Sequence, residues 1–328
     1  MKYILALDIG GTYTRLAMVE VSDDFKIAER LEISSAEIKN ITDTINNFLR
    51  ICGEKGLTTD TCVISMAGPI ENNACKKPPH VPFPVDGNEI KANSLLGKVM
   101  IINDFAAVSF GVLALDITDR SKIIAYSRKH LDERNRNIVV IGAGTGLGTS
   151  YITKDNGRYF VHESEGGHIS FDFLDLANSK LSHHLQKEKA LDYDSIVSGR
   201  GIRTLFEFHK QELPTAKQFE ILSEKDVPKK ICEMYNKDPV CKKVIKEFLM
   251  FYARFAQIAA LTFIPKGGIY IAGGIARKHI EFFKDGFFMH VFMAHPTMSH
   301  LLKEIPVYFV MEKDVALYGC AMAAIHKN

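Results

Sequence analysis

The sequence YILALDIGGTYTRLAMVEV, residues 3–21, returns in a related form as NIVVIGAGTGLGTSYIT, residues 137–153. Each stretch has strand-forming apolar residues on both sides of a glycine turn, which is the pattern of a β-hairpin. Superposing Asp8 on Gly142 brings the two glycine turns into register. An internal repeat of this kind indicates two related α/β domains that face each other.

The two turns have the composition of phosphate-binding loops. Phosphate oxygens need backbone N–H donors at close range, and any Cβ would hold a polyphosphate away. A dinucleotide fold would need a third glycine followed by a helix, but Leu147 stands at that position and strand-like residues follow. A Walker-type motif is also missing from the sequence. Either turn alone could be only a tight hairpin, so the expectation of a bound nucleotide triphosphate depends on the pair.

Asp8 stands beside the first glycine turn, where the repeat has Gly142. A carboxylate at a phosphate-binding loop repels its ligand unless a divalent cation lies between them. Asp8 is therefore a candidate Mg²⁺ ligand, either directly or through water. The alternative is that Asp8 accepts hydrogen bonds from the N–H groups of the turn.

The stretch VMIINDFAA, residues 99–107, predicts a buried strand that ends in Asn103 and Asp104. Open α/β sheets bind their ligands at the carboxyl ends of the strands, so Asp104 is the candidate for the chemistry. The alternative is that the pair only caps a helix that begins at Phe105, because both residue types accept hydrogen bonds from helix N-termini.

Composition limits the functions to be considered. The 328 residues, 46% hydrophobic and 24% charged, predict a globular protein of two domains. The 41 basic and 39 acidic residues are mixed along the chain, which favours a small-molecule ligand over nucleic acid or a membrane. Six cysteines without a C-x-x-C pair indicate reduced thiols and a cytoplasmic protein. The apolar residues 248–264 are interrupted by Arg254 and Gln257, which favours a buried helix over a membrane span.

Further elements follow from local patterns. Ser34 and Glu37 form a capping-box pattern that predicts the start of a helix ending near Gly53. Short apolar runs predict strands at 61–66, at 269–274 with a glycine pair at its end, and at 305–311. Helical periodicity predicts a buried helix at 244–258 that Pro265 ends, and a closing helix at 316–325.

The segment HESEGGH, residues 162–168, is dense in hydrogen-bonding groups and in glycine. Carboxylate, imidazole and amide groups around a ring are what the recognition of sugar hydroxyls requires. A zinc site is the alternative, but the spacing of the histidines and glutamates matches no usual ligand set. A Ser-His-Asp triad is disfavoured because no G-x-S-x-G motif occurs.

Seven motifs taken together resemble the bacterial-type glucokinase family, within the superfamily of hexokinases, actin and heat-shock chaperone ATPases. In chain order they are LALDIGGTYTRLA, VISMAGPI, IINDFAA, VVIGAGTGLG, SEGGHISF, IVSGRGI and GGIYIAGGI. The resemblance implies an actin-like ATPase/hexokinase fold, with two ribonuclease H-like α/β domains flanking an active-site cleft. The expected small domain is 1–113 plus 310–328, and the expected large domain is 114–309.

The resemblance also implies an activity, which is ATP-dependent phosphorylation of the 6-hydroxyl of glucose as the first step of glycolysis. The implied catalytic base is Asp104, and the implied partners are ATP, Mg²⁺ and glucose in a cytoplasmic homodimer. The sugar-binding positions matched are Asn103, Asp104, Glu165, His168 and Asp194. The nucleotide-binding positions matched are Asp8, Ile9, Gly10, Gly11, Thr12, Gly144, Thr145, Gly146, Gly273 and Gly274, with Asp8 also toward Mg²⁺.

Three departures from the family pattern concern the substrate. Asp194 replaces a glutamate, Tyr13 replaces an asparagine, and the loop 76–86 lacks the family's Thr-Asn and Trp, with His80 and Phe83 nearby. A kinase for another hexose, such as mannose or an N-acetylhexosamine, is therefore one alternative. A sugar sensor without catalytic activity is the other, and an intact Asp104 disfavours it.

Overall fold

The computed structural model describes residues 2–22, 25–79, 81–126, 137–171 and 180–326, so His80 lies outside the described residues. The chain divides into two compact units. Unit 1 comprises residues 1–123, 152–163 and 312–328, and unit 2 comprises residues 124–151 and 164–311. Each unit is described by itself. The predicted domain boundaries differ from these divisions at 114–123, 152–163 and 310–311, and they stay a prediction.

Unit 1 is built on a five-stranded sheet with the order β3-β2-β1-β4-β7. Strands β1, β2 and β3 form an antiparallel meander, and β4 and β7 run parallel to β1. The elements are β1 (Lys2–Ile9), β2 (Tyr13–Val21), β3 (Lys26–Ser34), α1 (Ile41–Glu54), β4 (Thr61–Met66), β5 (Ala74–Cys75), β6 (Val85–Asp86), α2 (Gly87–Ala92), β7 (Lys98–Asn103), α3 (Asp104–Ala114) and α13 (Val315–His326). The predicted hairpin and the strands at 61–66 and 99–103 are confirmed.

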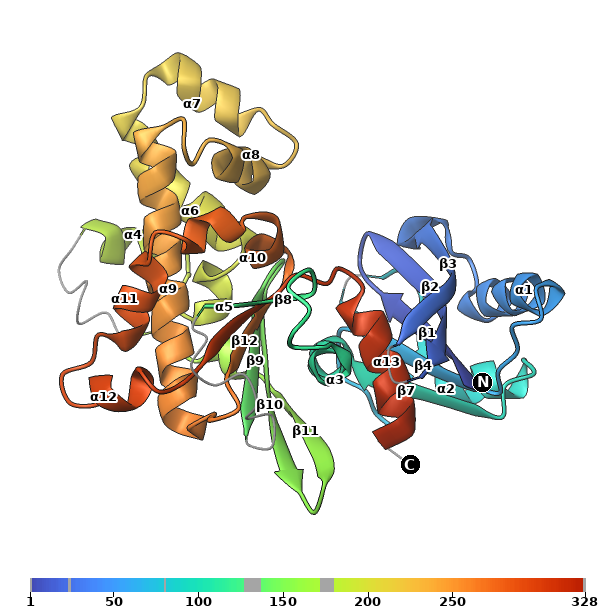
Figure 1. Ribbon diagram of the computed structural model, residues 1–328. Coiled ribbons are helices and arrows are strands. Elements are labelled where there is room, and N and C mark those ends of the chain that lie inside the picture. Colours follow the sequence, from blue (N-terminus) through green and yellow to red (C-terminus); the bar gives the residue numbers. More distant parts are fainter. Residues whose placement is uncertain (1, 23–24, 80, 127–136, 172–179, 327–328) are drawn as a thin grey trace. The chain divides into compact units, whose positions relative to one another are not determined.

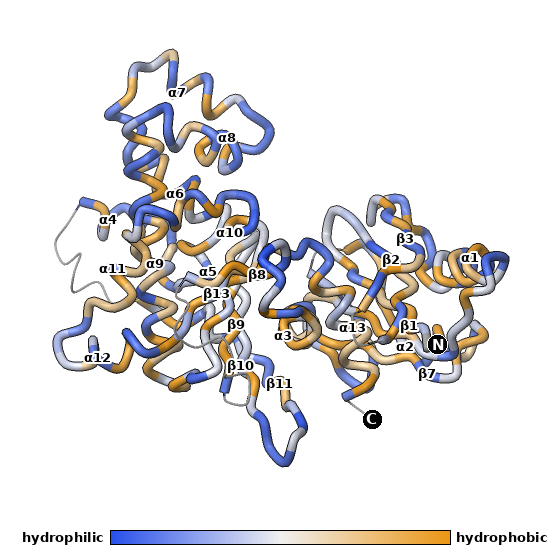
Figure 2. The backbone as a smooth tube through the Cα atoms, viewed as in Figure 1, coloured by the Kyte–Doolittle hydropathy of each residue, from blue (hydrophilic) through white to orange (hydrophobic). Residues whose placement is uncertain are grey.

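Alternation of side chains along the strands gives this sheet two apolar faces. Leu5 and Leu7 of β1 belong to the buried cluster that includes α1. Helices α3 and α13 pack against each other; α13 also packs against β1 and β4, and α3 packs against β4 and β7. Both helices are largely hydrophobic along their length, as Figure 2 shows. The closing helix predicted at 316–325 is thus confirmed as α13.

The capping-box prediction at Ser34 is wrong. Ser34 is the last residue of β3, and it makes no side-chain capping hydrogen bond. A 3₁₀ turn (Ser35–Glu37) follows, and α1 begins only at Ile41, where the Asn40 side chain accepts hydrogen bonds from Thr42 N and Asp43 N. Pairing with β2 extends the sheet through Ser34, and this pairing overrides the local helix signal.

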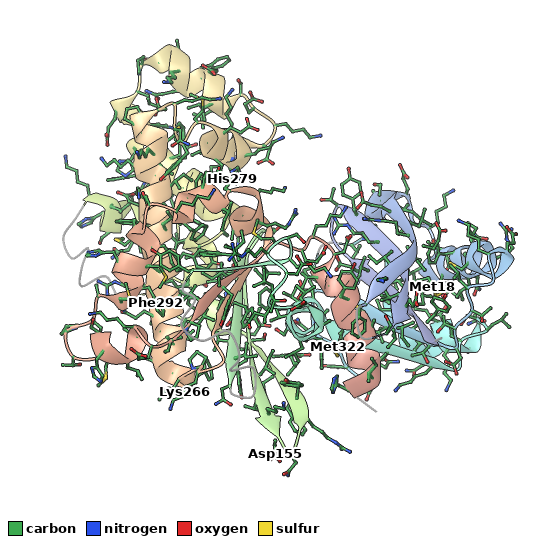
Figure 3. The ribbon with its side chains drawn as sticks, viewed as in Figure 1. Met18, Asp155, Lys266, His279, Phe292 and Met322 are labelled. Atoms are coloured by element: carbon green, nitrogen blue, oxygen red, sulfur yellow. The ribbon has the colours of Figure 1, made fainter. Side chains whose placement is uncertain are left out.

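Unit 2 carries most of a six-stranded sheet with the order β11-β10-β9-β12-β13-β8. The elements are β8 (Ile123–Ala125), β9 (Ile138–Ala143), β10 (Leu147–Asp155), β11 (Arg158–Ser164), α4 (Lys180–Lys187), α5 (Tyr193–Ile196), α6 (Gly199–His209), α7 (Thr215–Leu222), α8 (Val227–Glu233), α9 (Pro239–Phe263), β12 (Ile269–Ala272), α10 (Gly274–Lys278), α11 (Phe287–Met293), α12 (Ser299–Leu302) and β13 (Val307–Val310). The outer part of the β10–β11 hairpin, with Asp155 near its tip in Figure 3, counts with unit 1.

The internal repeat is confirmed at the level of topology. Strand β1 ends at Ile9 and β2 begins at Tyr13, whereas β9 ends at Ala143 and β10 begins at Leu147. The superposition that places Asp8 on Gly142 therefore also aligns these strand ends. Strand β9 pairs in parallel with β12 and β12 with β13, as β1 pairs with β4 and β4 with β7. The two glycine turns therefore occupy equivalent places in the two sheets.

The buried helix predicted at 244–258 is confirmed as the longer α9. It begins with Pro239 after Asp238, whose carboxylate accepts hydrogen bonds from Val240 N at 2.8 Å and Cys241 N at 2.9 Å. It ends where Ile264 adopts a left-handed backbone with φ of 44°. No described helix is both long enough and apolar enough to cross a bilayer. All six cysteines are buried free thiols.

Candidate active site

The predicted residues of unit 1 lie at one edge of its sheet. Asp8 of β1 is paired with Ser65 of β4, and Met66 of β4 is paired with Asn103 of β7. Because these three strands are parallel, their carboxyl ends meet at the same edge. The first glycine turn and the Asn103–Asp104 pair are thus brought to one side of the sheet by strand register.

Ser35 holds the first glycine turn in place. Its N–H donates to Thr12 O at 3.0 Å, and its hydroxyl donates to Gly10 O at 2.6 Å. Since that hydroxyl proton is used, the Thr14 hydroxyl donates to Ser35 Oγ, at 3.0 Å. Ser35 and Thr14 are fully buried. Two carbonyl groups of the turn are therefore already hydrogen-bonded to Ser35, and these bonds fix the shape of the turn without a ligand.

Asp8 is held by two neighbours. Arg15, directly opposite on β2, donates from Nη1 to Asp8 Oδ2 at 3.3 Å, and Ser65 Oγ donates to Asp8 Oδ1 at 3.3 Å. The alternative that Asp8 bonds the turn N–H groups is not what these contacts show. Burial raises the pKa of the Asp8 carboxyl, and this outweighs the lowering by Arg15 and Ser65. A divalent cation beside the carboxylate would favour its charged form.

The donor chemistry at Asp8 fits Mg²⁺. The carboxylate is only partly exposed, and hard oxygen donors are what this ion prefers. Over the described part of the chain, no three His, Cys, Asp or Glu side chains gather in a metal-binding group. Mg²⁺ at kinase sites is commonly held by one or two carboxylates together with phosphate oxygens and water, so a single carboxylate suffices.

Asn103 and Asp104 stand at the start of α3. Asn103 Oδ1 accepts hydrogen bonds from Phe105 N at 2.8 Å and Ala106 N at 3.2 Å, so the capping alternative holds for Asn103. Asp104 Oδ1 accepts a hydrogen bond from Phe105 N at 2.8 Å. Asp104 is the first residue of the helix and is half-buried, and a negative charge is favoured there by the helix dipole. Capping leaves the Asn103 amide nitrogen as a donor group.

In unit 2, Asp194 contacts the second glycine turn. Its Oδ1 accepts a hydrogen bond from Leu147 N at 2.7 Å, and its Oδ2 accepts one from Arg200 Nη2 at 2.8 Å. A Cβ at Gly146 would lie closer than 3.0 Å to Asp194 Oδ1, so a side chain there would displace the Asp194 carboxylate from the turn. The turn is also tied to the start of α6, because Gly199 N donates to Gly144 O at 2.9 Å.

Gly273 and Gly274 lie at the same edge of the second sheet as this turn. Ala272, the last residue of β12, is paired in parallel with Gly142 of β9. Gly273 has a φ of +91°, and a Cβ there would meet Ala143 O at 2.5 Å. The left-handed backbone and the close approach both require glycine. The two predicted nucleotide-binding segments of unit 2 therefore lie on neighbouring strand ends.

The Glu165-Gly166-Gly167-His168 segment packs on the beginning of β10. A Cβ at Gly167 would lie closer than 3.0 Å to Leu147 O, so this glycine lets the segment approach the strand. The Glu165 side chain is 87% exposed and the His168 side chain 58% exposed, as groups that meet a ligand must be. The zinc alternative gains no ligand set here among the described residues.

His168 has a partner that the sequence reasoning missed. Its Nδ1 lies 3.0 Å from Asp192 Oδ2, and this hydrogen bond raises the pKa of the imidazole. Because the folded-state pKa is raised, the imidazolium contributes stability at low pH, and the contribution is lost as pH rises through the folded pKa. Asp192 begins a capping box with Ser195, which is visible in the sequence, but nothing local indicates His168 as its partner.

Four further residues of the site were missed. Ser35 donates a hydrogen bond to the first turn. Arg15 and Ser65 donate to the Asp8 carboxylate, and Arg200 donates to the Asp194 carboxylate. Only the pairing of Arg15 with Asp8 could have been expected, from the register of the predicted hairpin. The other contacts join residues that are remote in sequence or depend on where a helix begins.

Comparisons with known proteins agree on one family. The family model described as glucokinase matches residues 5–327. The glucokinase of Trichormus variabilis is 31% identical, over 99% of this chain and 99% of that protein. Among solved structures, a glucokinase from an Antarctic psychrotroph is 25% identical with a TM-score of 0.83, covering 100% of both chains. The Balamuthia mandrillaris glucokinase in complex with glucose is 21% identical with a TM-score of 0.77, covering 98% of this chain and 94% of that one.

Proposed function

The chain belongs to the glucokinase family, and on that premise we propose which of its residues carry the reaction. It is a glucokinase, an enzyme that phosphorylates glucose with ATP. The predicted α/β fold of the actin-like ATPase/hexokinase type is confirmed by the two repeated sheets and by the matching glucokinase structures. The roles of individual residues, Mg²⁺, the homodimer and the cellular compartment are the proposal.

Asp104 is the proposed general base. Its carboxylate accepts the proton of the glucose 6-hydroxyl while O6 bonds to the γ-phosphorus and the bond from that phosphorus to the β,γ-bridging oxygen breaks. The products are glucose 6-phosphate and ADP. The observation that carries this assignment is the register that brings Asp104 and the first glycine turn to one sheet edge. A base in such a position contributes about 10²- to 10⁴-fold, and positioning and charge neutralisation contribute much of the rest.

Three groups are proposed to bind the sugar. The Asn103 amide nitrogen donates to a hydroxyl, the exposed Glu165 carboxylate accepts from hydroxyls, and the exposed His168 imidazole presents Nε2 to the ring. Support comes from their exposure and from the packing of residues 165–168 on β10. The carboxylate at 194, which the resemblance assigns to the sugar as well, is engaged with Leu147 N and Arg200.

The phosphates are proposed to bind the two glycine turns. Residues 8–12 and 144–146 would supply backbone N–H groups other than those of Gly10 and Gly144, which donate to Tyr13 O at 3.0 Å and to Gly146 O at 2.8 Å, with Gly273 and Gly274 against the adenosine. Mg²⁺ would be held by Asp8 through water, and when bound it neutralises the charge of the phosphates. The hydrogen bonds of Ser35 to the first turn and of Asp194 to Leu147 N hold the two turns in shape, which reduces the rearrangement needed when phosphate binds.

We further propose a homodimer in the cytoplasm. The first part follows from the family resemblance, and six buried free thiols are compatible with a reducing compartment. Sedimentation equilibrium tests the oligomeric state against the chain mass of 36.8 kDa, and a single species of that mass would refute the dimer.

A panel of hexoses tests the substrate. We expect glucose to give the highest kcat/KM among glucose, mannose, fructose and N-acetylglucosamine, measured by coupled release of ADP. Replacing Mg²⁺ with EDTA in the same assay should reduce turnover to background. A different sugar preferred by about tenfold or more, equivalent to about 1.4 kcal/mol of transition-state discrimination, would contradict the assignment of glucose. The shorter carboxylate at 194 makes this alternative worth testing.

A further inference from the structure

Two aspartates of one short segment, Asp192 and Asp194, face different partners. Asp192 Oδ2 lies 3.0 Å from His168 Nδ1, whereas Asp194 Oδ1 accepts a hydrogen bond from Leu147 N at 2.7 Å. The first contact reaches a proposed sugar-binding residue, and the second reaches the end of a proposed phosphate-binding turn. The segment therefore contacts both the proposed sugar-binding residues and the proposed phosphate-binding turn of unit 2.

Asp192 is held rigidly. Its Oδ1 accepts a hydrogen bond from Ser195 N at 2.8 Å, and the Ser195 hydroxyl donates to Asp192 O at 2.7 Å. Its backbone forms a β-bridge with Ser170, and the next residue donates from Tyr193 N to Ile169 O at 3.1 Å. With one carboxylate oxygen and the backbone fixed, the other oxygen is directed at the His168 ring.

This contact sets the chemical state of His168. A carboxylate only accepts, so Nδ1 of the imidazole carries the proton and Nε2 is left to face a ligand. Nε2 accepts a hydrogen bond when the ring is neutral and donates one when the ring is protonated. Besides Asp192, the charged groups that act on the ring are Asp194 and Glu165, whose Oε2 lies 3.9 Å from Nε2. Asp192 thus fixes both the orientation and the tautomer of a sugar-binding group.

Asp194 has different hydrogen-bond partners from Asp192. Both of its oxygens are used, by Leu147 N and by Arg200 Nη2, and its side chain is only 16% exposed. Its Oδ1 also occupies the space that a side chain at Gly146 would fill. The glutamate that the family resemblance places here would be one methylene longer. The shorter aspartate stays at the turn, where it accepts a hydrogen bond from Leu147 N, the first residue after the turn.

We propose that these two carboxylates divide the work of the site: Asp192 is a positioning residue for the sugar, acting through His168, and Asp194 is a positioning residue for the phosphates, acting through the turn at 144–146. This inference rests on the proposed function. It reassigns Asp194, which the family resemblance places at the sugar, and it adds Asp192.

Steady-state kinetics of the full chain separate the two roles. Asp192→Asn keeps an amide oxygen for the helix cap but removes the charged acceptor for His168, so the KM for glucose should rise about tenfold or more while the KM for ATP changes less than about twofold. In Asp194→Asn, the KM for ATP should rise about tenfold or more while the KM for glucose changes less than about twofold. A higher glucose KM in Asp194→Asn with an unchanged ATP KM, or an unchanged glucose KM in Asp192→Asn, would overturn the inference.

Two controls distinguish a positioning role from a structural one. The NMR-measured pKa of His168 should fall toward the ordinary value of about 6.5 in Asp192→Asn and stay raised in Asp192→Glu. Asp192→Ser retains a good helix cap without the histidine contact, so it should share the kinetic defect of Asp192→Asn at near wild-type thermal stability, measured at a pH above the folded-state pKa of His168. An unshifted His168 pKa in Asp192→Asn would contradict the inference. If the proposed function itself failed, wild-type protein would phosphorylate no hexose in the panel, which is a different result from misplaced KM changes.

Discussion

Replacing Asp104 with asparagine is expected to lower kcat for glucose by about 10²- to 10⁴-fold while glucose still binds. The amide has nearly the same shape as the carboxylate but cannot accept the 6-hydroxyl proton. The helix start should survive, because Asn103 Oδ1 provides its own cap to Phe105 N and Ala106 N. The coupled ADP-release assay measures turnover, and titration calorimetry measures glucose binding.

The matched control is Asp43→Asn. Asp43 is also an acidic residue in the first turn of a helix of unit 1, namely α1, but it is exposed and lies outside the candidate site. It should retain wild-type kcat. If Asp104→Asn kept turnover within about tenfold of wild type, another group would have to be the base. A sugar sensor would instead bind glucose without turnover in the unaltered chain.

Replacing Gly319 with alanine is expected to reduce the free energy of unfolding by about 3 kcal/mol, because it overpacks the contact between α13 and α3. A Cβ at Gly319 would lie closer than 3.0 Å to Ala107 O and would meet Gly111 N at 2.7 Å. These neighbours are backbone atoms of a packed helix, which cannot turn aside as a flexible side chain would. Since α3 begins with Asp104, any shift of that helix also displaces the proposed base.

Urea unfolding followed by circular dichroism measures the loss, and kcat measured below the transition reports the displacement of α3. Gly53→Ala is the control, because Gly53 lies near the end of α1 and a Cβ there would meet nothing within 4 Å. That change should leave stability unchanged or raise it by about 0.5–1 kcal/mol. An unfolding midpoint for Gly319→Ala equal to that of wild type would mean that the contact between α13 and α3 has room for a methyl group at Gly319.

Local patterns predicted most of the elements. Alternating apolar residues on both sides of glycine specify β1, β2, β9 and β10, and a run of apolar residues with helical spacing specifies α9. The pattern failed at Ser34, where serine followed by glutamate three residues later has the form of a helix start. The strand β3 competes for the same residues, and its pairing with β2 is a non-local interaction that no local motif contains.

The candidate site divides in the same way. Asp8, Asn103 and Asp104 could be selected from sequence because each stands where a predicted strand ends, and parallel strands bring such ends together. Ser35 could not, since it acts on a turn formed by residues much earlier in the chain. The choice between Asp192 and Asp194 as the partner of His168 could not be made either, because both are acidic and only two residues apart.

The amino-acid sequence alone indicated the family, through the resemblance of seven motifs. It also determined the repeated α/β architecture and the residue types at the ends of the strands, because these follow from periodicity and from the backbone freedom of glycine. Tertiary structure alone decided which carboxylate contacts His168 and which contacts Leu147, what holds each glycine turn and how closely α3 and α13 pack. Hydrogen bonds of about 3 Å between segments remote in the chain depend on the complete fold, and their geometry has no counterpart in the order of the residues.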